Sequence, residues 1–334
     1  MKNKVVTRIT GTGSYLPGHI MTNDDLSNIM DTSDEWIFSR TGIKERHLAK
    51  DETTAFMAAE AGKKALEDAG VEAAEVDLII AGTITGDYVT PSTACEVQEK
   101  LGAVNAVAFD INAACAGFMF AFHTAHAYLQ SGIYKTALVL GVETLSKILD
   151  WKDRSTCVLF GDGAGAAVVC ADGEKEKELS EGNGGILAFE QGSDGRRGMA
   201  LNCCGRKNRN PLTDNGWIPS YVSMDGQEVY KFAVSTVPVS IQRVLDKAGL
   251  HVEDVKYFVL HQANIRILQS VAKRLKADIG KFPVGLDHCG NMSAASVPVL
   301  LDEMNRKGAL EKGDKIVMAG FGGGLTWASA VVEW

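Results

Sequence analysis

The feature that most constrains the fold of this chain is an internal repeat. Residues 65–83 align with residues 244–262 at a constant offset of 179, and each copy reads as a helix closed by glycine and followed by an apolar strand. Residues 160–169 and 321–332 form a second pair, each with a glycine turn before a β-rich run, at an offset of 161. The pattern predicts two similar halves, with about 18 extra residues in a loop or insertion of the first half.

Apolar runs and amphipathic segments alternate along both halves. Strand-like runs at 76–81, 137–141, 164–169, 256–260 and 315–318 alternate with helical patterns such as 54–69 and 237–248. This alternation predicts an α/β sheet with helices on its faces. Residues 171–185 are rich in Glu, Lys, Ser and Gly, and we interpret them as the junction between the halves, the alternative being a surface loop. The predicted domains are therefore 1–175 and 176–334.

Composition excludes several classes of function. Acidic residues outnumber basic ones by 42 to 34, and the net charge of -8 argues against a nucleic-acid partner while leaving room for a local basic patch. No apolar run approaches the ~20 residues of a membrane span, and the first residues lack an apolar signal core, so we expect a cytoplasmic chain without a membrane partner. The seven cysteines lack metal-type spacing, which favours reduced, mostly buried thiols and no metal.

One cysteine stands at an unusual position. The strand-like run 107–110 leads into a small-residue segment, 113–118, and then into an apolar helix that we expect to reach about residue 129. This places Cys115 at a helix start, where the positive end of the helix dipole favours the nucleophilic thiolate. The alternative is a small residue that only packs among alanines.

Two polar residues occupy comparable positions in the second half. His261 follows the apolar run 257–260, and Asn291 lies in 290–298, the glycine-led entry to the helix that matches the Cys115 helix. Strand ends and helix starts are where open α/β sheets place their sites. Each residue alone could be structural, but the three together indicate a nucleophile with two hydrogen-bond donors.

These segments resemble a known family, β-ketoacyl-acyl carrier protein synthase III, the initiating condensing enzyme of bacterial type II fatty acid synthesis. The resemblance runs through nearly the whole chain. It rests on residues 113–118, 261–266, 290–298 and 321–324, with 11–17, 31–37 and 40–43 also similar. The resemblance implies a thiolase-like fold, in which duplicated α/β halves form a five-layer α/β/α/β/α arrangement.

The resemblance also implies a mechanism. Cys115 would accept an acyl group from a short acyl-coenzyme A, and a malonyl group on acyl carrier protein would lose carbon dioxide and attack the acyl-Cys115 carbonyl. The backbone N–H groups of Cys115 and Gly323 would hold the acyl oxyanion, and His261 and Asn291 would hold the enolate. No metal or redox cofactor is expected. Whether His261 or the helix dipole alone handles the thiol proton stays open.

Further residues match binding positions of the family. Trp36 and Arg154 resemble a pair that sandwiches the adenine of coenzyme A, the alternative being a surface contact without a ligand. The full set of expected coenzyme A contacts is Trp36, Arg40, Thr41, Arg154, Gly226, Ala263 and Asn264. The segment 265–276 contains four basic residues and no acidic one, and the basic residues are Arg266, Lys273, Arg274 and Lys276. They would suit the acidic carrier protein. The alternative is that they form only a solvated helix face.

One position departs from family members restricted to acetyl primers, which often carry a bulky aromatic residue there. It is Thr90, in a segment that contributes to the partner subunit's acyl pocket in the family, which implies a homodimer. A smaller side chain predicts tolerance of longer or branched primers.

Two alternatives to this function are a related condensing enzyme of a polyketide, quinolone or acyl–acyl condensation pathway, and a silent acyl-coenzyme A-binding protein. The sequence assigns no role to Cys203, Cys204 or the insert 206–217.

Overall fold

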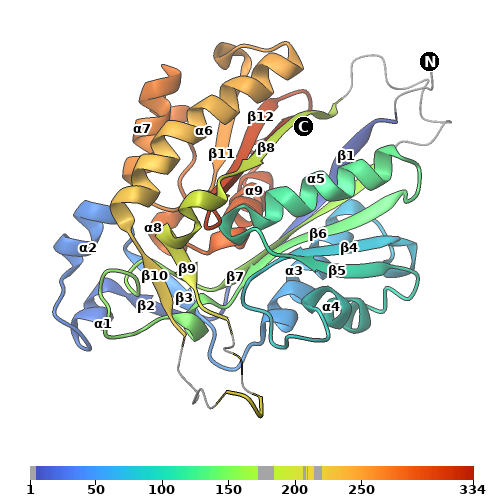
Figure 1. The fold of residues 1–334 in the computed structure, drawn as a ribbon. Helices are drawn as coiled ribbons and strands as arrows, with labels where there is room; N and C mark the ends of the chain where they lie inside the picture. The colour runs from blue at the N-terminus through green and yellow to red at the C-terminus, as the bar shows by residue number, and fades with distance from the viewer. Residues whose placement is uncertain (1–4, 172–183, 206–207, 209, 214–219) are drawn as a thin grey trace.

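Two mixed β-sheets form the framework of the chain (Figure 1). The computed structural model describes residues 5–171, 184–205, 208, 210–213 and 220–334. The first sheet has the order β1-β7-β6-β4-β5, with strands Thr7–Tyr15, Gly163–Ala171, Thr136–Glu143, Leu78–Gly82 and Val107–Ile111. The second has the order β11-β12-β13-β8, with strands Tyr257–Leu260, Lys315–Gly322, Thr326–Glu333 and Gly185–Ser193.

The two sheets are built alike, which confirms the predicted duplication. The pairs β4/β6 and β11/β12 are parallel, and each sheet then continues through two antiparallel pairs. Strand β12 begins and ends 179 residues after β6, the offset of the sequence repeat. Strand β5 extends only the first sheet, so its outer edge has no partner strand among the described residues.

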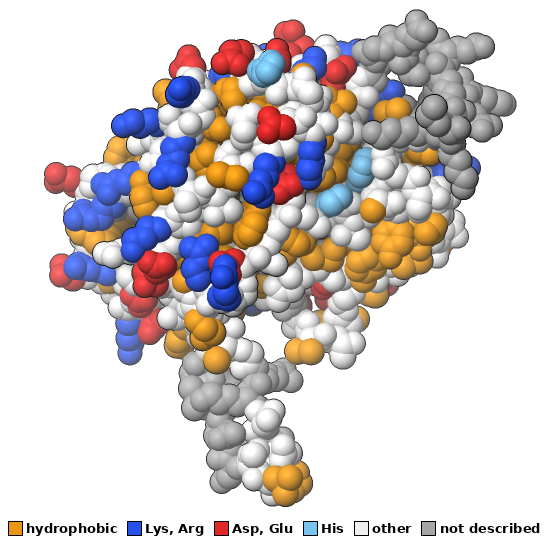
Figure 2. Space-filling view, turned by 45° about the horizontal axis from the view of Figure 1, so that its top comes forward, with side chains coloured by type: hydrophobic (Ala, Val, Ile, Leu, Met, Phe, Trp, Pro, Cys, Tyr) orange, Lys and Arg blue, Asp and Glu red, His pale blue; other side chains and the backbone are white. Residues whose placement is uncertain are grey.

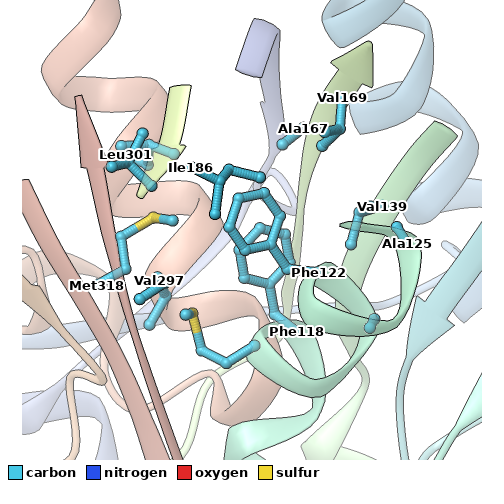
Figure 3. Close-up of a cluster of buried hydrophobic side chains, with 14 of the residues drawn as sticks. Phe118, Phe122, Ala125, Val139, Ala167, Val169, Ile186, Val297, Leu301 and Met318 are labelled. Atoms are coloured by element: carbon cyan, nitrogen blue, oxygen red, sulfur yellow. The ribbon is translucent and has the colours of Figure 1, made fainter. Parts of the chain in front are cut away.

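Helices lie on both faces of each sheet and give five layers. Helices α5 (Gly117–Gln130) and α9 (Ser296–Arg306) lie between the sheets, where their apolar side chains meet inward-facing residues of both (Figure 3). Helices α3 (Thr54–Ala69) and α4 (Thr93–Leu101) cover the outer face of the first sheet. Helices α6 (Gly226–Ala248) and α7 (Ile265–Leu275) cover the outer face of the second. The predicted α/β/α/β/α arrangement is therefore present.

The predicted strands are present, with β12 extending to Gly322 rather than residue 318, and the two predicted helices differ in how well their bounds agree. Helix α3 spans the predicted residues because the Thr53 side chain caps its start and Gly70, at a φ of 63°, ends it. Helix α6 begins at Gly226 rather than at residue 237, since the side chain of Asp225 caps the earlier start. The sequence pattern placed the start beside Pro238, yet this proline is buried inside the helix.

Smaller elements complete the described chain. Strands β2 (His19–Thr22) and β3 (Glu45–Leu48) form one two-stranded sheet, and β9 (Leu201–Cys203) and β10 (Val222–Met224) form another. Helices α1 (Asn23–Ser27), α2 (Asp34–Thr41) and α8 (Leu286–Cys289) are short. The extra residues of the first half lie between β6 and β7, at 144–162, where the second half has only 323–325.

Some sequence predictions fall outside the described residues. Most of the presumed junction (172–183) and much of the insert (206–207, 209 and 214–217) lie there, so the division at 175/176 stays a prediction. None of the helices in the described part of the chain combines the length and apolar character that a membrane span requires.

Glycines let the end of each central strand lie against the opposite half. A Cβ atom at Gly141 in β6 would overlap the carbonyl oxygen of Ala294, which lies just before α9. At the equivalent position of β12, a Cβ atom at Gly320 would lie 3.0 Å from the Cα atom of Ala116, just before α5. The two central helices can therefore start between the sheets only because these strand positions have no side chain.

We predict that Gly141→Ala destabilises the fold by about 3 kcal/mol, because its new methyl group would meet backbone that a side-chain movement cannot clear. Urea unfolding would measure the loss as a lower midpoint with an unchanged slope. Gly18→Ala is the matched control, since nothing lies within 4 Å of a Cβ atom there. Equal midpoints for the two variants would contradict this packing argument.

Candidate active site

Cys115 lies in a tight turn that leads into the first central helix. The 3₁₀ turn η2 (Ala114–Ala116) directly precedes α5, and Ala114 adopts a left-handed φ of 47°. This turn directs Cys115 toward the second sheet, where a Cβ atom at Gly322 would lie 3.0 Å from its Sγ atom. Cys115 is 7% exposed, so a buried thiol rests against a glycine at the end of β12.

Burial has the largest effect on the pKa of the Cys115 thiol. Desolvation raises the pKa of Cys115 to about 12, and hydrogen bonds from Ser293 and the backbone of Cys115 and Gly323 oppose this rise only in part. The sequence argument that the helix start favours the thiolate therefore omits the larger influence. At neutral pH the resting Cys115 is therefore a thiol. A proton acceptor is needed when its sulfur reacts.

His261 comes directly after β11, as the sequence indicates, and its backbone N–H donates to the carbonyl oxygen of Ala319 in β12 at 2.8 Å. Its ring is 2% exposed and meets Phe321 edge-on at 5.1 Å between centroids. Burial lowers the pKa of His261 to about 3, so the imidazole is neutral. Its Nδ1 atom has no hydrogen-bond partner among the described residues.

Asn291 is held by its backbone and by one side-chain atom. Its N–H donates to the carbonyl oxygen of Leu159 at 2.9 Å, and its carbonyl oxygen accepts from the N–H of Gly161. Its Oδ1 atom accepts from the backbone N–H of Ser293 at 2.9 Å. Because Oδ1 is engaged, the amide NH₂ group is the part of this 6% exposed residue that can donate to a ligand.

The three predicted residues share structural neighbours. Cys115 rests against the end of β12, and His261 follows the strand that pairs with β12. Asn291 lies just before the 3₁₀ turn η8 (Ser293–Ala295), which packs against the turn η2 that contains Cys115. The sheet pairing and this turn therefore bring the thiol, the imidazole and the amide to one end of the second sheet.

Three of the expected coenzyme A contacts form a group at the surface. The guanidinium groups of Arg40 and Arg154 lie 4.6 and 5.0 Å from the ring centroid of Trp36. Asn264, the N-cap of α7, donates from its side chain to the carbonyl oxygen of Arg40 at 3.0 Å. Thr41 follows on α2 and is buried, with its hydroxyl bonded to the carbonyl oxygen of Ile37.

Other expected site residues lie apart from this group. Ala263 is half-buried beside Asn264, whereas Gly226 is exposed at the start of α6. Thr90 is exposed in the loop between β4 and α4. The four basic residues after His261 are all exposed, three on α7 and Lys276 at its C-cap.

Sequence reasoning missed two polar residues next to Cys115. The Ser293 hydroxyl lowers the pKa of the Cys115 thiol and donates to the buried carboxyl group of Glu143 at 3.1 Å. The sequence did carry a signal, because Glu143 is a charged residue that ends an otherwise apolar strand run. It also stands 179 residues before Gly322, the glycine that faces Cys115.

One group of side chains in the described chain has metal-ligating types, namely His288, Cys289 and Glu303. Both ring nitrogens of His288 already have carboxylate partners, Asp287 at 3.0 Å and Glu303 at 2.8 Å. Hydrogen bonds that the imidazolium ring donates to Cys289 and Glu303 raise the pKa of His288 to about 11. The contacts are those of an imidazolium held between carboxylates.

Comparisons with known proteins identify the class of protein that this fold and site define. Residues 109–195 match the family model of 3-oxoacyl-[acyl-carrier-protein (ACP)] synthase III, and residues 245–334 match the model of its C-terminal part. The β-ketoacyl-[acyl-carrier-protein] synthase III of Clostridium acetobutylicum is 51% identical over 327 residues, which cover 98% of each chain. These are condensing acyltransferases.

Solved structures support the same assignment to the synthase III family. The 3-oxoacyl-[acyl-carrier-protein] synthase III of Aquifex aeolicus is 44% identical, with a TM-score of 0.90 over 98% of this chain and 100% of the other. A priming β-ketosynthase from the R1128 polyketide pathway is 36% identical, with a TM-score of 0.90 over 99% and 97%. The chain belongs to the 3-oxoacyl-[acyl-carrier-protein] synthase III family, and the thiolase-like fold predicted for it is confirmed.

We predict that Cys115 reacts slowly with iodoacetamide at pH 7 and about 10-fold faster for each pH unit up to pH 9. The reason is that only the thiolate reacts, and its fraction grows with pH below a pKa of about 12. Peptide mass mapping would follow Cys115 beside the exposed Cys203 and Cys204, which should be alkylated first. A rate at Cys115 that stays flat from pH 7 to 9 would indicate a stable thiolate instead.

Proposed function

We propose that this chain condenses a short acyl-coenzyme A with malonyl-acyl carrier protein through an acyl-Cys115 intermediate. The products would be 3-oxoacyl-acyl carrier protein, coenzyme A and carbon dioxide, the first condensation of type II fatty acid synthesis. One observation carries the proposal: a buried thiol at a helix start shares neighbours with a neutral imidazole and an oriented amide. Membership of the synthase III family supports it.

In the first half-reaction, the Cys115 sulfur attacks the thioester carbonyl carbon, and coenzyme A leaves as its thiolate. The carbonyl oxygen becomes an oxyanion that needs fixed donors. We assign the backbone N–H groups of Cys115 and Gly323 to it, because both lower the pKa of the Cys115 thiol. Loss of one such donor typically costs ~10² to 10³ in rate.

In the second half-reaction, malonyl-acyl carrier protein loses carbon dioxide, and the resulting enolate attacks the acyl-Cys115 carbonyl. We assign His261 and Asn291 to the enolate oxygen. A neutral imidazole suits this task, because one ring nitrogen donates while no charged group has to be buried. These steps use hydrogen-bond donors only, and the proposal includes no metal or redox cofactor.

The surface group around Trp36 would bind the nucleotide of coenzyme A. A half-buried indole with a guanidinium group over its ring suits the flat adenine base, which could replace one of the two arginines. Thr41, Ala263 and Asn264 would line the path inward, because Asn264 ties the start of α7 to Arg40. Gly226 is assigned to this path from the family resemblance alone.

Helix α7 would dock the carrier protein. Its exposed Arg266, Lys273 and Arg274, with Lys276 at the C-cap, form a basic surface on a chain whose net charge is -8. Figure 2 shows Lys and Arg side chains gathered on the side of the molecule where α6 and α7 lie in Figure 1. An acidic carrier would be steered to this side.

We also propose a cytoplasmic homodimer. Strand β5 presents an open edge among the described residues, and Val107 on it is 48% exposed. Tyr88 and Val89, in the loop before α4, are 63% and 81% exposed. Figure 2 shows hydrophobic side chains gathered on the side where α5 and β5 lie in Figure 1. A second copy of the chain would cover both features and would receive Thr90 in its acyl pocket.

The condensation would be tested by intact-protein mass after mixing with acetyl-, isobutyryl- or octanoyl-coenzyme A. We expect an adduct of acyl mass on the wild type and none on Cys115→Ser, because the serine hydroxyl is a far weaker nucleophile in this site. Malonyl-acyl carrier protein should then discharge the adduct as 3-oxoacyl carrier protein. No adduct from any donor would leave an acyl-coenzyme A-binding protein, and discharge only by another extender would favour a specialised pathway such as that of the polyketide priming relative.

The small side chain of Thr90 predicts a broad primer range. Thr90→Phe should reduce acylation by isobutyryl- and octanoyl-coenzyme A by about 10-fold or more relative to acetyl-coenzyme A, because the aromatic ring would fill the partner's pocket. The same sample should sediment at twice the 35.8 kDa chain mass. A monomer, or an unchanged primer ratio in Thr90→Phe, would contradict the shared pocket.

A further inference from the structure

The side chain of Asn291 depends on one contact for its orientation. Its backbone is fixed by hydrogen bonds to the segment 159–161, whereas its amide group has a single hydrogen bond within the described chain, from the N–H of Ser293 to Oδ1 at 2.9 Å. Because a backbone N–H can only donate, the amide turns its oxygen toward Ser293 and its NH₂ group away. The position of Ser293 therefore sets the direction in which Asn291 can donate.

Ser293 has a backbone conformation that serine rarely adopts. Its φ of 48° lies in the left-handed region, where a residue other than glycine persists only if its surroundings hold it. The equivalent residue of the first half, Ala114, has a φ of 47° without a hydroxyl group, so the turn itself does not require one. Asn112 before that turn is exposed, whereas Asn291 is 6% exposed. The hydroxyl group is thus an addition in the half with the buried amide.

Glu143 holds this hydroxyl group. It ends β6, is 0% exposed, and accepts from the Ser293 hydroxyl through Oε1 at 3.1 Å. Its other oxygen, Oε2, accepts from three donors of the loop after β4, the hydroxyl groups of Thr83 and Thr85 and the N–H of Ile84. One oxygen therefore anchors the carboxyl group, and the other holds Ser293.

The loop that anchors Glu143 is itself fixed to its neighbours. The hydroxyl oxygen of Thr85 accepts from the N–H of Thr144 at 2.8 Å, and its carbonyl oxygen accepts from the Thr54 hydroxyl at 2.7 Å. The carboxylate of Asp87 accepts from two N–H groups at the start of α3. The contacts thus run without a break from the first sheet and α3 to the amide of Asn291.

We propose that Glu143 and Ser293 are positioning residues that fix the amide of Asn291 for the condensation step. Glu143 holds Ser293, and the N–H of Ser293 keeps the NH₂ group of Asn291 turned toward the enolate. The inference rests on the proposed function, in which Asn291 donates to the enolate and has no part in acylation. It requires the length of the Glu143 side chain rather than its charge.

Two variants of Glu143 separate length from charge. Glu143→Asp keeps the acid but is one methylene shorter, so its carboxyl group cannot reach both the loop donors and Ser293. Glu143→Gln keeps the length, since its amide oxygen can accept from the loop donors and its NH₂ group can donate to the Ser293 oxygen. A positioning role therefore predicts a defect in Glu143→Asp, and an acid–base role predicts the reverse order.

The two half-reactions would be timed separately by rapid-quench mass spectrometry. With the acyl enzyme formed beforehand, saturating malonyl-acyl carrier protein should discharge Glu143→Asp about 10-fold more slowly than wild type, a part of the ~10² to 10³ that loss of a whole donor costs. Glu143→Gln should stay within about 3-fold of wild type. Acylation by acetyl-coenzyme A should stay within about 3-fold in both variants, because it uses other donors.

A double variant tests whether Glu143 acts through the amide. Asn291→Ala removes the donor that Glu143 positions, so Glu143→Asp should add no further loss to the discharge rate of Asn291→Ala. A general loosening of the fold would instead slow the double variant by the product of the two single effects.

Thr144→Val is the matched control. It removes a buried hydrogen bond to the hydroxyl of Thr54 but keeps the backbone N–H that fixes the loop, so both half-reactions should keep wild-type rates within about 3-fold. Urea unfolding of each variant would show which rate changes accompany a loss of stability.

The outcomes separate this inference from the proposed function. A wild type that forms no acyl adduct would reject the proposed function. A wild type that acylates and discharges, with Glu143→Asp as fast in discharge, would overturn the positioning role alone. The same conclusion would follow if Glu143→Asp slowed both half-reactions alike, if Glu143→Gln were the slower variant, or if the effects multiplied in the double variant.

Discussion

The structure depends on one steric condition, the contact of each central strand with the helix start of the opposite half. Strand β6 reaches the turn before α9 because Gly141 has no side chain, and β12 reaches the turn before α5 through Gly320 and Gly322. These contacts bury both helix starts between two sheets. They also strip water from Cys115 at one helix start and from His261 and Glu143 at the ends of neighbouring strands, which explains why the thiol, the imidazole and the carboxyl group have displaced pKa values.

Equivalent positions of the duplicated halves differ in chemistry. The offset of 179 relates Cys115 to Ala294 and Ala114 to Ser293, and it relates Glu143 to Gly322 at the ends of β6 and β12. One helix start thus has the sulfur and faces a glycine, while the other has a hydroxyl group and faces an acid. The duplication supplies two helix starts with matching backbones. The different side chains at their equivalent positions make the two sides of the site chemically distinct.

The repeat and the alternation of strands and helices were sufficient to predict the architecture, because glycine caps and apolar strand runs report local structure directly. The positions of Cys115, His261 and Asn291 were also predictable, since each stands at a strand end or helix start. The burial of the thiol was not, because it arises from β12, some 200 residues further along the chain. Ser293 and Glu143 escaped notice for the same reason: their partners come from the opposite half.

The segment 144–162 has a consequence for how this molecule can change. It packs with α1 and α2 in a hydrophobic cluster of its own, around Leu26, Ile37, Leu149 and Phe160, and it contains Arg154. The corresponding connection 323–325 of the second half is too short to vary without moving Gly322 away from the sulfur. Under the proposed function, the segment that would recognise coenzyme A can therefore diverge in sequence while the position of Cys115 and the glycine against it stays fixed.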